Sequence, residues 1–335
     1  MDDNSLTKKI ADSYELANNV LEHIPNPLVS IRTSAYNHGP YIKQCIEGVL
    51  MQRTNFPFEY IIGEDFSNDE TRQIVFEYAK KYPNIIRVIT ADYNVGSRAN
   101  GRRCIQACRG KYMAICEGDD YWIDPLKLQK QVDFLENHPD YGLVYGGAKV
   151  FYQSRNEYGK NLIGSSCLDV DDLLIANRVV TLTTCFHRTL YLHYVNEIMP
   201  LLDRSKMGDY PLWLYIAFHS KLHFFSEPLG VYRVLDESVS HNRNAREEAE
   251  FVLSSYSIKK MFVEKYGKKY LLKRIRRFVV ETIEKKYLSH DEKCDISLLR
   301  ANELSIFVSL RSVVLYVLSC FNWSRKLYLR KNVNS

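Results

Sequence analysis

Three carboxylates stand within four residues in the segment Glu117-Gly118-Asp119-Asp120, which directly follows the apolar run KYMAIC. Carboxylates so close together repel one another and raise some of their own pKa values unless a cation lies among them. A Mg²⁺ ion resolves this conflict, because it takes one or two carboxylates and completes its shell with phosphate oxygens. The segment therefore predicts a site for a divalent metal and a phosphate group, with a solvated acidic turn as the alternative.

Polar residues also follow other apolar runs. Ser34 and Tyr36 follow the run LVSI and could enclose a nucleobase by stacking and hydrogen bonding, unless they form an ordinary turn. Asp65 follows FEYIIG, where a carboxylate could accept a hydrogen bond from a ring N–H while its neighbours cap the next helix. Arg98 and Asn100, in NVGSRANGRR, could contact the phosphate or base of a nucleotide, or could lie on a solvated helix face.

The elements that must position these residues form an alternating pattern of short apolar runs and helical periodicity between residues 27 and 152. We expect strands at 28–31, 58–63, 85–90, 111–116 and 142–152, and helices at 41–52, 70–81, 98–108 and 125–138, the last of them followed by Pro139. This alternation is typical of a parallel α/β sheet, whose ligands bind beyond the carboxyl ends of the strands.

The pattern becomes mixed between residues 165 and 242, in an added half that completes a cleft. We expect helices near 169–177 and at 210–219, and a strand at 183–188. Asp209 stands just before the second of these helices, so it could serve as a general base or simply cap that helix. Helical patterns dominate beyond residue 245.

Several chemistries lack their sequence signatures. The NVGSRANGRR segment has no Lys-Ser/Thr of a P-loop, and no Gly-x-Gly-x-x-Gly occurs, which excludes nucleoside triphosphatase activity and the usual dinucleotide site. No Ser-His-Asp or Cys-His arrangement points to covalent catalysis. The eight cysteines include no Cys-x-x-Cys pair, which favours reduced thiols over a zinc site. The first thirty residues lack the features of a secretory signal, so we expect a cytoplasmic location.

The net charge of +5 conceals an asymmetry, because residues 251–335 hold 18 Lys and Arg against 7 Asp and Glu. These cations are mixed with aliphatic and aromatic residues, which favours an anionic membrane surface over nucleic acid as the partner; a solvated basic helix face is the alternative. The apolar segment 304–322 has Arg311 at its centre and serines along one helical stripe. A charge there opposes insertion, so we expect an interfacial or internally packed helix rather than a membrane span.

Five segments together resemble the family 2 glycosyltransferases of the GT-A fold, namely LVSIRTSAYN, FEYIIGEDFSND, residues 94–100, KYMAICEGDDYW with PLKLQKQ, and MGDYPLW. The resemblance covers about residues 28–240. It implies an α/β fold of the GT-A type, which is a Rossmann-like mixed sheet with helices on both faces, plus a helical C-terminal extension. We expect an N-terminal helical segment at 1–26, a catalytic domain at 27–243 with its nucleotide-binding half to about residue 150, and a basic helical region at 244–335.

The resemblance also implies roles for the residues of the nucleotide-binding half. The acid that matches Asp65 binds the nucleobase, and the segment with Ser34 and Tyr36 helps to enclose it. The acidic motif, often Asp-x-Asp, binds the ribose and the divalent metal, and in this chain Glu replaces the first Asp. Asp119 and Asp120 are both expected in the site, with Asp120 slightly favoured as the metal ligand.

Asp209 falls where the family keeps its catalytic base in an acidic pair, although Gly208 replaces the first acid. The Gln-x-x-Arg-Trp motif of processive members is missing and VYRVLDESVSH stands in its place, which implies transfer of one sugar per encounter. Within that segment Arg233 or His241 is expected to reach the diphosphate, and His241 is also a candidate metal ligand.

These residues imply an inverting, metal-dependent glycosyltransferase of the hexosyltransferase type. It would move one sugar from a nucleoside-diphosphate sugar, with a UDP-sugar favoured, to a hydroxyl of a glycan acceptor, and Mn²⁺ or Mg²⁺ would assist the departure of the diphosphate. The basic, apolar C-terminal region suggests a lipid-linked acceptor and a peripheral position at the inner face of the cell membrane. The alternatives are a weak or inactive scaffold that binds a sugar nucleotide or a membrane, and a sugar nucleotidylyltransferase.

Overall fold

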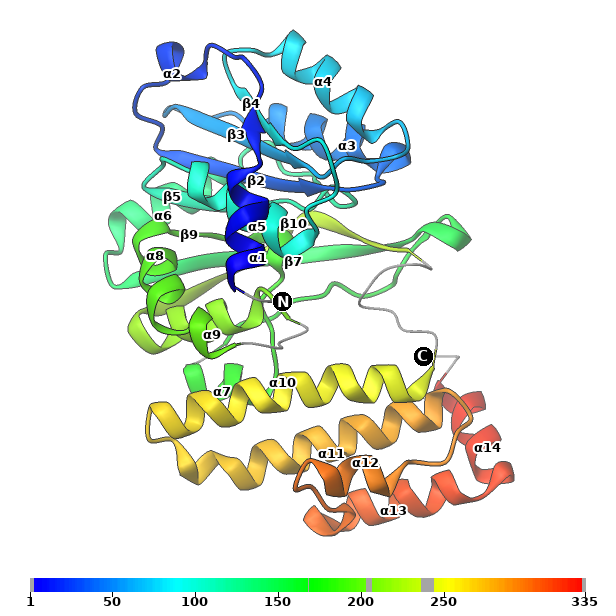
Figure 1. Cartoon of the computed structure of the whole chain (residues 1–335). Helices are drawn as coiled ribbons and strands as arrows, with labels where there is room; N and C mark the ends of the chain where they lie inside the picture. Colours follow the sequence, from blue (N-terminus) through cyan, green and yellow to red (C-terminus); the bar gives the residue numbers. More distant parts are fainter. Residues whose placement is uncertain (1–2, 168, 203–206, 236–243, 333–335) are drawn as a thin grey trace. The chain divides into compact units, whose positions relative to one another are not determined.

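The computed structural model describes residues 3–167, 169–202, 207–235 and 244–332, and the chain divides into two compact units (Figure 1). The first unit comprises Met1–Asp169, Arg178–Asn196 and Tyr215–Val234. The second comprises Val170–Asn177, Glu197–Leu214 and Leu235–Ser335. A sheet lies at the centre of the first unit, whereas the second is built from helices.

A mixed sheet of ten strands, counted over the described ranges, forms the framework of the first unit. In chain order the strands are β1 (Tyr14–Glu15), β2 (Val29–Ala35), β3 (Phe58–Glu64), β4 (Ile86–Thr90), β5 (Tyr112–Ile115), β6 (Tyr121–Trp122), β7 (Tyr141–Tyr152), β8 (Glu157–Tyr158), β9 (Cys185–His187) and β10 (Lys221–Val234). Their spatial order is β1-β4-β3-β2-β5-β9-β7-β10-β6, with β8 paired to β7. The strands expected from the apolar runs are all present, with ends shifted by up to a few residues.

The strands β4, β3, β2 and β5 run parallel, and nearly all of their residues are buried. Continuous apolar runs of this kind are typical of parallel strands that helices cover on both faces. The alternating pattern places β7 next to β5, but β9 lies between them and runs antiparallel to both. Because β7 and β10 run in the same direction as β5, the carboxyl ends of all these strands lie at one edge of the sheet, here called the carboxyl edge.

Helices cover the sheet in two apolar clusters. The helices that lie within this unit are α1 (Asp3–Ala11), α2 (Val20–His23), α3 (Gly39–Leu50), α4 (Thr71–Lys81), α5 (Ser97–Ala107) and α6 (Lys127–Asn137), and α8 (Arg188–Glu197) lies in it except for its last residue. Apolar residues of α3, α4 and α6 share one core with the sheet, whereas α1 and α5 contribute to a second cluster that includes Leu6 and Ala99. The first 26 residues also contain β1, which pairs antiparallel with β4, so this segment is helical only in part.

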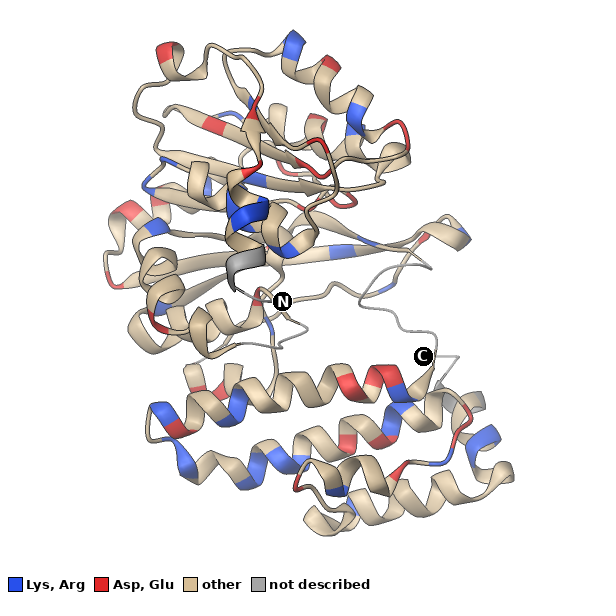
Figure 2. Cartoon of the chain, viewed as in Figure 1, with Lys and Arg blue, Asp and Glu red and all other residues tan. Residues whose placement is uncertain are grey.

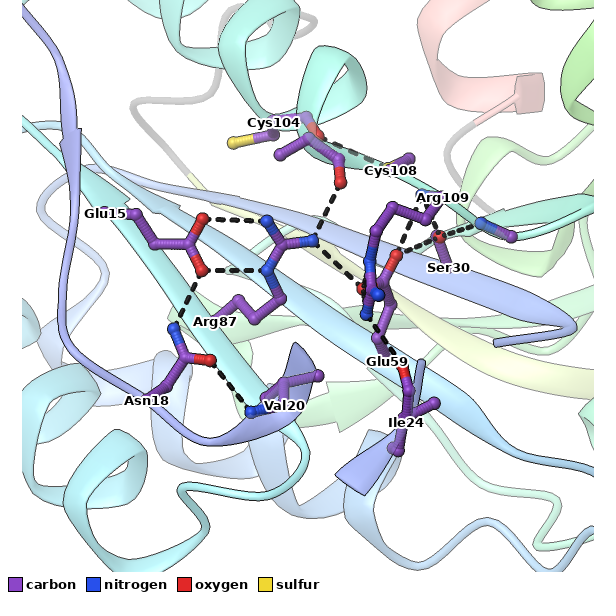
Figure 3. A network of polar contacts seen from close by, with 12 residues as sticks. Glu15, Asn18, Val20, Ile24, Ser30, Glu59, Arg87, Cys104, Cys108 and Arg109 are labelled. Atoms are coloured by element: carbon purple, nitrogen blue, oxygen red, sulfur yellow. Dashed lines mark hydrogen bonds and ion pairs between the residues drawn. The ribbon is translucent and has the colours of Figure 1, made fainter. Parts of the chain in front are cut away.

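A buried network of ion pairs joins the amino-terminal ends of the central strands (Figure 3). The carboxylate of Glu59 in β3 is fully buried and accepts hydrogen bonds from Ser30 Oγ at 2.6 Å and Arg87 Nη1 at 3.0 Å. The guanidinium of Arg109 donates two more, from Nη2 at 2.6 Å and from Nε at 2.9 Å. Arg87 also pairs with both carboxylate oxygens of Glu15 in β1, at 2.7 and 2.8 Å. The burial of Glu59 is tolerated because these donors replace its lost hydration.

The second unit is helical. It contains α7 (Val170–Ile175), α10 (Ala245–Lys265), α11 (Leu272–Ser289), α12 (Ile296–Ala301), α13 (Leu310–Cys320) and α14 (Asn322–Asn332), and α9 (Tyr210–His219) begins in it. Helix α11 packs against α10 and α13 (Figure 1). Within the segment 304–322, α13 packs against α11 on one side, where Ser312 and Ser319 of the serine stripe are buried. Among the residues that the structure describes, every helix is too short or too polar to traverse a bilayer.

The buried carboxyl group of Glu284 makes the stability of the second unit dependent on pH. Glu284 in α11 accepts a hydrogen bond from Ser312 Oγ at 2.7 Å, and burial raises its pKa from 4.5 to about 8. Between these values the folded state holds a proton that the unfolded chain releases, so stability falls as the pH rises. We expect the free energy of unfolding of the wild type to fall by about 2–4 kcal/mol between about pH 5 and 9, and we expect Glu284→Gln to remove this fall. Urea unfolding at each pH provides the measurement.

The control for this experiment is Glu292→Gln, which changes an exposed carboxylate of the same unit and should keep the pH dependence of the wild type. An unchanged pH dependence in Glu284→Gln would show that Glu284 does not titrate in this range.

Candidate functional site

The acidic loop, residues 117–120, leaves β5 at the carboxyl edge and lies against the end of β2. The backbone N–H of Gly118 donates a hydrogen bond to the carbonyl oxygen of Ser34 at 3.1 Å. A Cβ atom at position 118 would lie 2.9 Å from that oxygen and 2.5 Å from Nδ1 of His38, so a larger residue would push the two segments apart. This close approach holds Ser34 beside the acidic loop.

Asp120 is the most deeply buried acid of this loop, with 5% of its surface exposed. Its Oδ1 atom accepts a hydrogen bond from the backbone N–H of Arg233 at 2.8 Å. Burial, followed by the charges of Asp119 and Glu117, raises the pKa of Asp120 well above its usual range. The carboxylate of Asp119 is half-buried and makes no hydrogen bond or ion pair with any residue that the structure describes. Within the described residues, neither carboxylate therefore forms an ion pair.

Arg233 lies near the carboxyl end of β10 and is held from several sides. Its Nε donates to the backbone carbonyl of Asp119 at 2.8 Å. Its two terminal nitrogens donate to the side-chain oxygens of Gln153 and Gln44, both at 2.7 Å. Three aromatic rings surround the guanidinium, and the closest is Tyr41, at 4.8 Å from its ring centre. The two glutamines were missed by the sequence analysis, because residues so far apart along the chain give no local signal.

Arg32 of β2 is another residue of this region that the sequence analysis missed. Its Nη2 pairs with Glu117 at 2.7 Å, and its Nη1 donates to Ser34 Oγ at 2.7 Å. Arg32 thereby neutralises the acid that replaces the first Asp of the family motif. A signal was present, since an arginine inside the apolar run LVSIRTSA requires a partner when the strand is buried.

Asp65 holds the turn that precedes α5. Its two carboxylate oxygens accept hydrogen bonds from the backbone N–H groups of Val95 at 2.9 Å and Gly96 at 3.0 Å, and Arg103 lies 3.7 Å away. Gly96 has a φ of +88°, a left-handed conformation that favours glycine. Burial raises the pKa of Asp65, while the two N–H groups and Arg103 oppose that rise. Asp65 is buried, with 2% of its surface exposed.

The other predicted nucleotide contacts differ in exposure. Asn100 is buried, where its Nδ2 donates to the carbonyl of Gly63 at 2.8 Å and its Oδ1 accepts from Arg103 Nε at 3.0 Å. Asn100 thus ties α5 to β3 from inside the fold, and its predicted contact with a nucleotide is not retained. Arg98, in the first turn of α5, and Tyr36, just beyond β2, are both exposed.

Asp209 belongs to the second unit and begins α9. Its carbonyl oxygen accepts from the N–H groups of Leu212 at 2.9 Å and Trp213 at 3.1 Å, and its Oδ1 accepts from the N–H of Tyr210 at 2.7 Å. The backbone carbonyl of Asp209 thus starts α9, and its half-buried carboxylate remains the candidate base. His241 lies outside the described residues.

Asp119 and Asp120 are the residues that could hold a divalent cation. Within the described ranges, no group of three or more His, Cys, Asp or Glu side chains forms a ready metal cage. Two adjacent carboxylates that form no ion pair with the described residues fit an ion that takes its other ligands from phosphate and water, such as Mg²⁺. They do not fit a structural zinc site, which needs four protein ligands.

Comparison with known proteins gives a family match. The model for glycosyl transferase family 2 matches residues 30–196. An uncharacterised protein of Mycobacterium tuberculosis is 35% identical over 217 residues, which are 64% of this chain and 61% of that protein. The chain therefore spans less than two thirds of that relative's length. WfgD of Escherichia coli, a UDP-Glc:α-D-GlcNAc-diphosphoundecaprenol β-1,3-glucosyltransferase, is 25% identical over 64% of this chain and 81% of its own.

Two solved structures share the architecture. TarS of Staphylococcus aureus, in complex with UDP-GlcNAc, has a TM-score of 0.54 at 13% identity, covering 87% of this chain and 90% of that one. The mannosyltransferase PcManGT of Pyrobaculum calidifontis, in complex with GDP-Man and Mn²⁺, has a TM-score of 0.50 at 13% identity, covering 91% and 87%. At these identities the likeness concerns the fold alone. From the family match and this fold, the chain belongs to the family 2 glycosyltransferases and has their GT-A architecture.

Proposed function

We propose that this protein transfers one sugar from a nucleoside-diphosphate sugar to a hydroxyl group of a glycan acceptor, with inversion at the anomeric carbon. The observation that carries the proposal is the pair of neighbouring carboxylates Asp119 and Asp120, held beside Ser34 and Arg233 at the carboxyl edge. That edge is where α/β sheets bind nucleotides.

Asp119 and Asp120 would hold Mn²⁺ or Mg²⁺ together with the diphosphate of the donor. When bound, the ion would stabilise the negative charge that develops on the departing diphosphate. Arg233 supports the same role, because three of the five N–H donors of its guanidinium are used within the described structure and two remain for phosphate oxygens.

The nucleoside would lie along the neighbouring loops. Tyr36 offers an exposed ring for stacking, and the buried carboxylate of Asp65 would position the loop before α5 that lies beside the base. Ser34 would lie near the ribose, and Arg98 near the nucleotide. A UDP-sugar is favoured, because TarS binds UDP-GlcNAc and the name of WfgD specifies UDP-Glc, whereas PcManGT binds GDP-Man.

Asp209 would act as the general base. It would take the proton of the acceptor hydroxyl while the hydroxyl oxygen bonds to the anomeric carbon and the bond to the diphosphate breaks. Attack from the face opposite the leaving group inverts the configuration, so no covalent intermediate is needed. Transfer of a single sugar per encounter is consistent with the sequence VYRVLDESVSH in place of the processive motif.

The acceptor would be lipid-linked and the enzyme peripheral at the inner face of the cell membrane. The name of WfgD specifies an acceptor linked to diphosphoundecaprenol, which supports this acceptor class. The excess of 18 Lys and Arg over 7 Asp and Glu in residues 251–335 supports attraction to anionic lipid.

The test is a panel of UDP- and GDP-sugars, each incubated with Mn²⁺ or Mg²⁺. A bound donor raises the melting temperature by mass action, which selects the nucleotide and sugar. The selected donor is then followed by NMR with a lipid-linked acceptor, and we expect metal-dependent transfer to a product of inverted anomeric configuration. Retention of configuration would overturn the inverting mechanism. Donor binding without hydrolysis or transfer under any condition would instead indicate a scaffold.

A further inference from the structure

The last two helices expose an unusual amount of apolar surface. Seven large apolar side chains between residues 307 and 327 each keep between 48% and 82% of their surface exposed. They form what we call the C-terminal apolar face, which consists of Phe307, Leu310, Val314, Val317, Phe321, Trp323 and Leu327. Four of them recur at helical spacing in and just after α13, so they lie along one side of that helix.

The outward side of α13 is largely apolar. Its buried side carries Leu315 together with Ser312 and Ser319, and Ser312 Oγ donates to Glu284 of α11 at 2.7 Å. Its exposed side carries Leu310, which is 82% exposed, two half-exposed valines and Arg311. Soluble helices place apolar residues inward and polar residues outward. The exposed leucine and valines therefore indicate an apolar environment outside this side of the helix.

Positive charge accompanies this face. Residues 305–332 contain five Lys and Arg and no Asp or Glu. Figure 2 shows that α13 is mostly uncharged and that basic residues lie along α14. The side chain of Arg311 is 61% exposed, and Lys326 is also exposed. A face that combines exposed aliphatic and aromatic residues with cations matches the boundary between anionic headgroups and acyl chains.

We infer that the C-terminal apolar face docks onto an anionic lipid surface, with its apolar side chains at the level of the headgroups and its cations against the lipid phosphates. A second copy of the chain is a poorer occupant, because a two-fold contact would bring the exposed cations Arg311 and Lys326 against the same cations of the other copy. Trp323, which is 68% exposed, suits the interface because an indole ring is apolar and also donates a hydrogen bond.

This inference rests on the membrane association proposed above and identifies the surface responsible. Vesicle binding requires neither donor nor acceptor, so it is tested separately from sugar transfer. A failure to bind vesicles would leave the proposed reaction intact, and a failure of transfer would leave the docking face intact.

The experiment measures binding of the full chain to vesicles of phosphatidylcholine alone and to vesicles of an equimolar mixture of phosphatidylcholine and phosphatidylglycerol. Trp323 is a native probe, because the other two tryptophans, Trp122 and Trp213, are buried. We expect the mixed vesicles to shift the fluorescence of Trp323 to the blue, to shield it from acrylamide, and to sediment the protein. Phosphatidylcholine alone should do so weakly.

Two sets of variants separate the apolar and charged contributions. The triple variant Leu310→Ser, Val314→Ser and Val317→Ser should weaken binding by about tenfold or more. Arg311→Gln and Lys326→Gln should each weaken binding to the anionic vesicles by roughly fivefold, and these losses should shrink at high salt. Leu162→Ser removes an exposed leucine of the first unit and is the matched control, which should bind as the wild type does.

Circular dichroism checks that the triple variant is folded, which we expect because the substituted side chains are exposed. The inference is overturned if the folded triple variant binds anionic vesicles as tightly as the wild type. It is also overturned if the wild type binds neither vesicle, or if it forms a dimer that the triple variant loses.

Discussion

Replacing Asp209 with asparagine is expected to lower kcat for sugar transfer by about 10²–10⁴-fold, the usual contribution of a positioned general base. Asparagine cannot take a proton from the acceptor hydroxyl. It caps helices as well as aspartate does, so the hydrogen bond from the N–H of Tyr210, at 2.7 Å, and the start of α9 should persist. The affinity for UDP should therefore remain that of the wild type, measured by calorimetric titration beside the kinetics.

Asp133→Asn is the matched control for this variant, since it removes an exposed carboxylate of α6 and should leave kcat unchanged. The assignment of Asp209 fails if Asp209→Asn keeps kcat within about threefold of the wild type, because loss of a general base costs far more than this. A parallel loss of UDP affinity and thermal stability would instead indicate a structural role.

Replacing Glu59 with alanine is expected to destabilise the first unit by about 3–5 kcal/mol, because the change removes the acceptor of several buried and half-buried donors, including Arg109. Arg87 would keep Glu15 as a partner, whereas Arg109 would lose its ion pair with Glu59, at 2.6 Å (Figure 3). The free energy of unfolding, from guanidinium chloride titration followed by circular dichroism, provides the measurement. The stability of Glu59→Gln should lie between those of the wild type and Glu59→Ala, because glutamine retains the shape of glutamate and one acceptor oxygen.

Glu77→Ala is the control for the network, since it removes an exposed glutamate of α4 and should cost less than about 0.5 kcal/mol. A loss below about 1 kcal/mol in both Glu59 variants would contradict the view that the network stabilises the sheet.

The order of strands and helices in the first unit follows from local patterns in the sequence. The runs LVSI, FEYIIG and IIRVIT are mostly apolar, and each becomes a buried parallel strand. Periodicity also identifies the helices that follow these strands. Which strands lie side by side is harder to predict. The three-residue strand β9 lies between β5 and β7 although it is distant from β5 in the sequence. Strand β1 has only two residues and no pattern that could reveal it.

The residues of the site also divide into those that a local sequence pattern predicts and those whose position depends on contacts with distant parts of the chain. The position of the acidic loop could be predicted, since it depends only on the end of one apolar run. The neutralisation of Glu117 by Arg32 could have been inferred from a charge inside a buried strand. The burial of Asn100 could not, because its contacts with Gly63 and Arg103 depend on how α5 lies against the sheet. The sequence shows which functional group a helix residue carries, but it does not show whether that group is buried or exposed.

The measurement that most directly tests the central role of the acidic loop is the affinity of UDP, by calorimetric titration, with Mn²⁺ and with EDTA. The wild type should bind UDP about tenfold or more tightly with Mn²⁺, which corresponds to ~1.4 kcal/mol. Asp120→Asn preserves an acceptor for the N–H of Arg233, at 2.8 Å, but removes the charge. It should bind UDP equally with and without Mn²⁺. The account would be contradicted if Mn²⁺ did not change the affinity of the wild type for UDP. It would also be contradicted if Mn²⁺ increased the affinity of Asp120→Asn for UDP as much as that of the wild type.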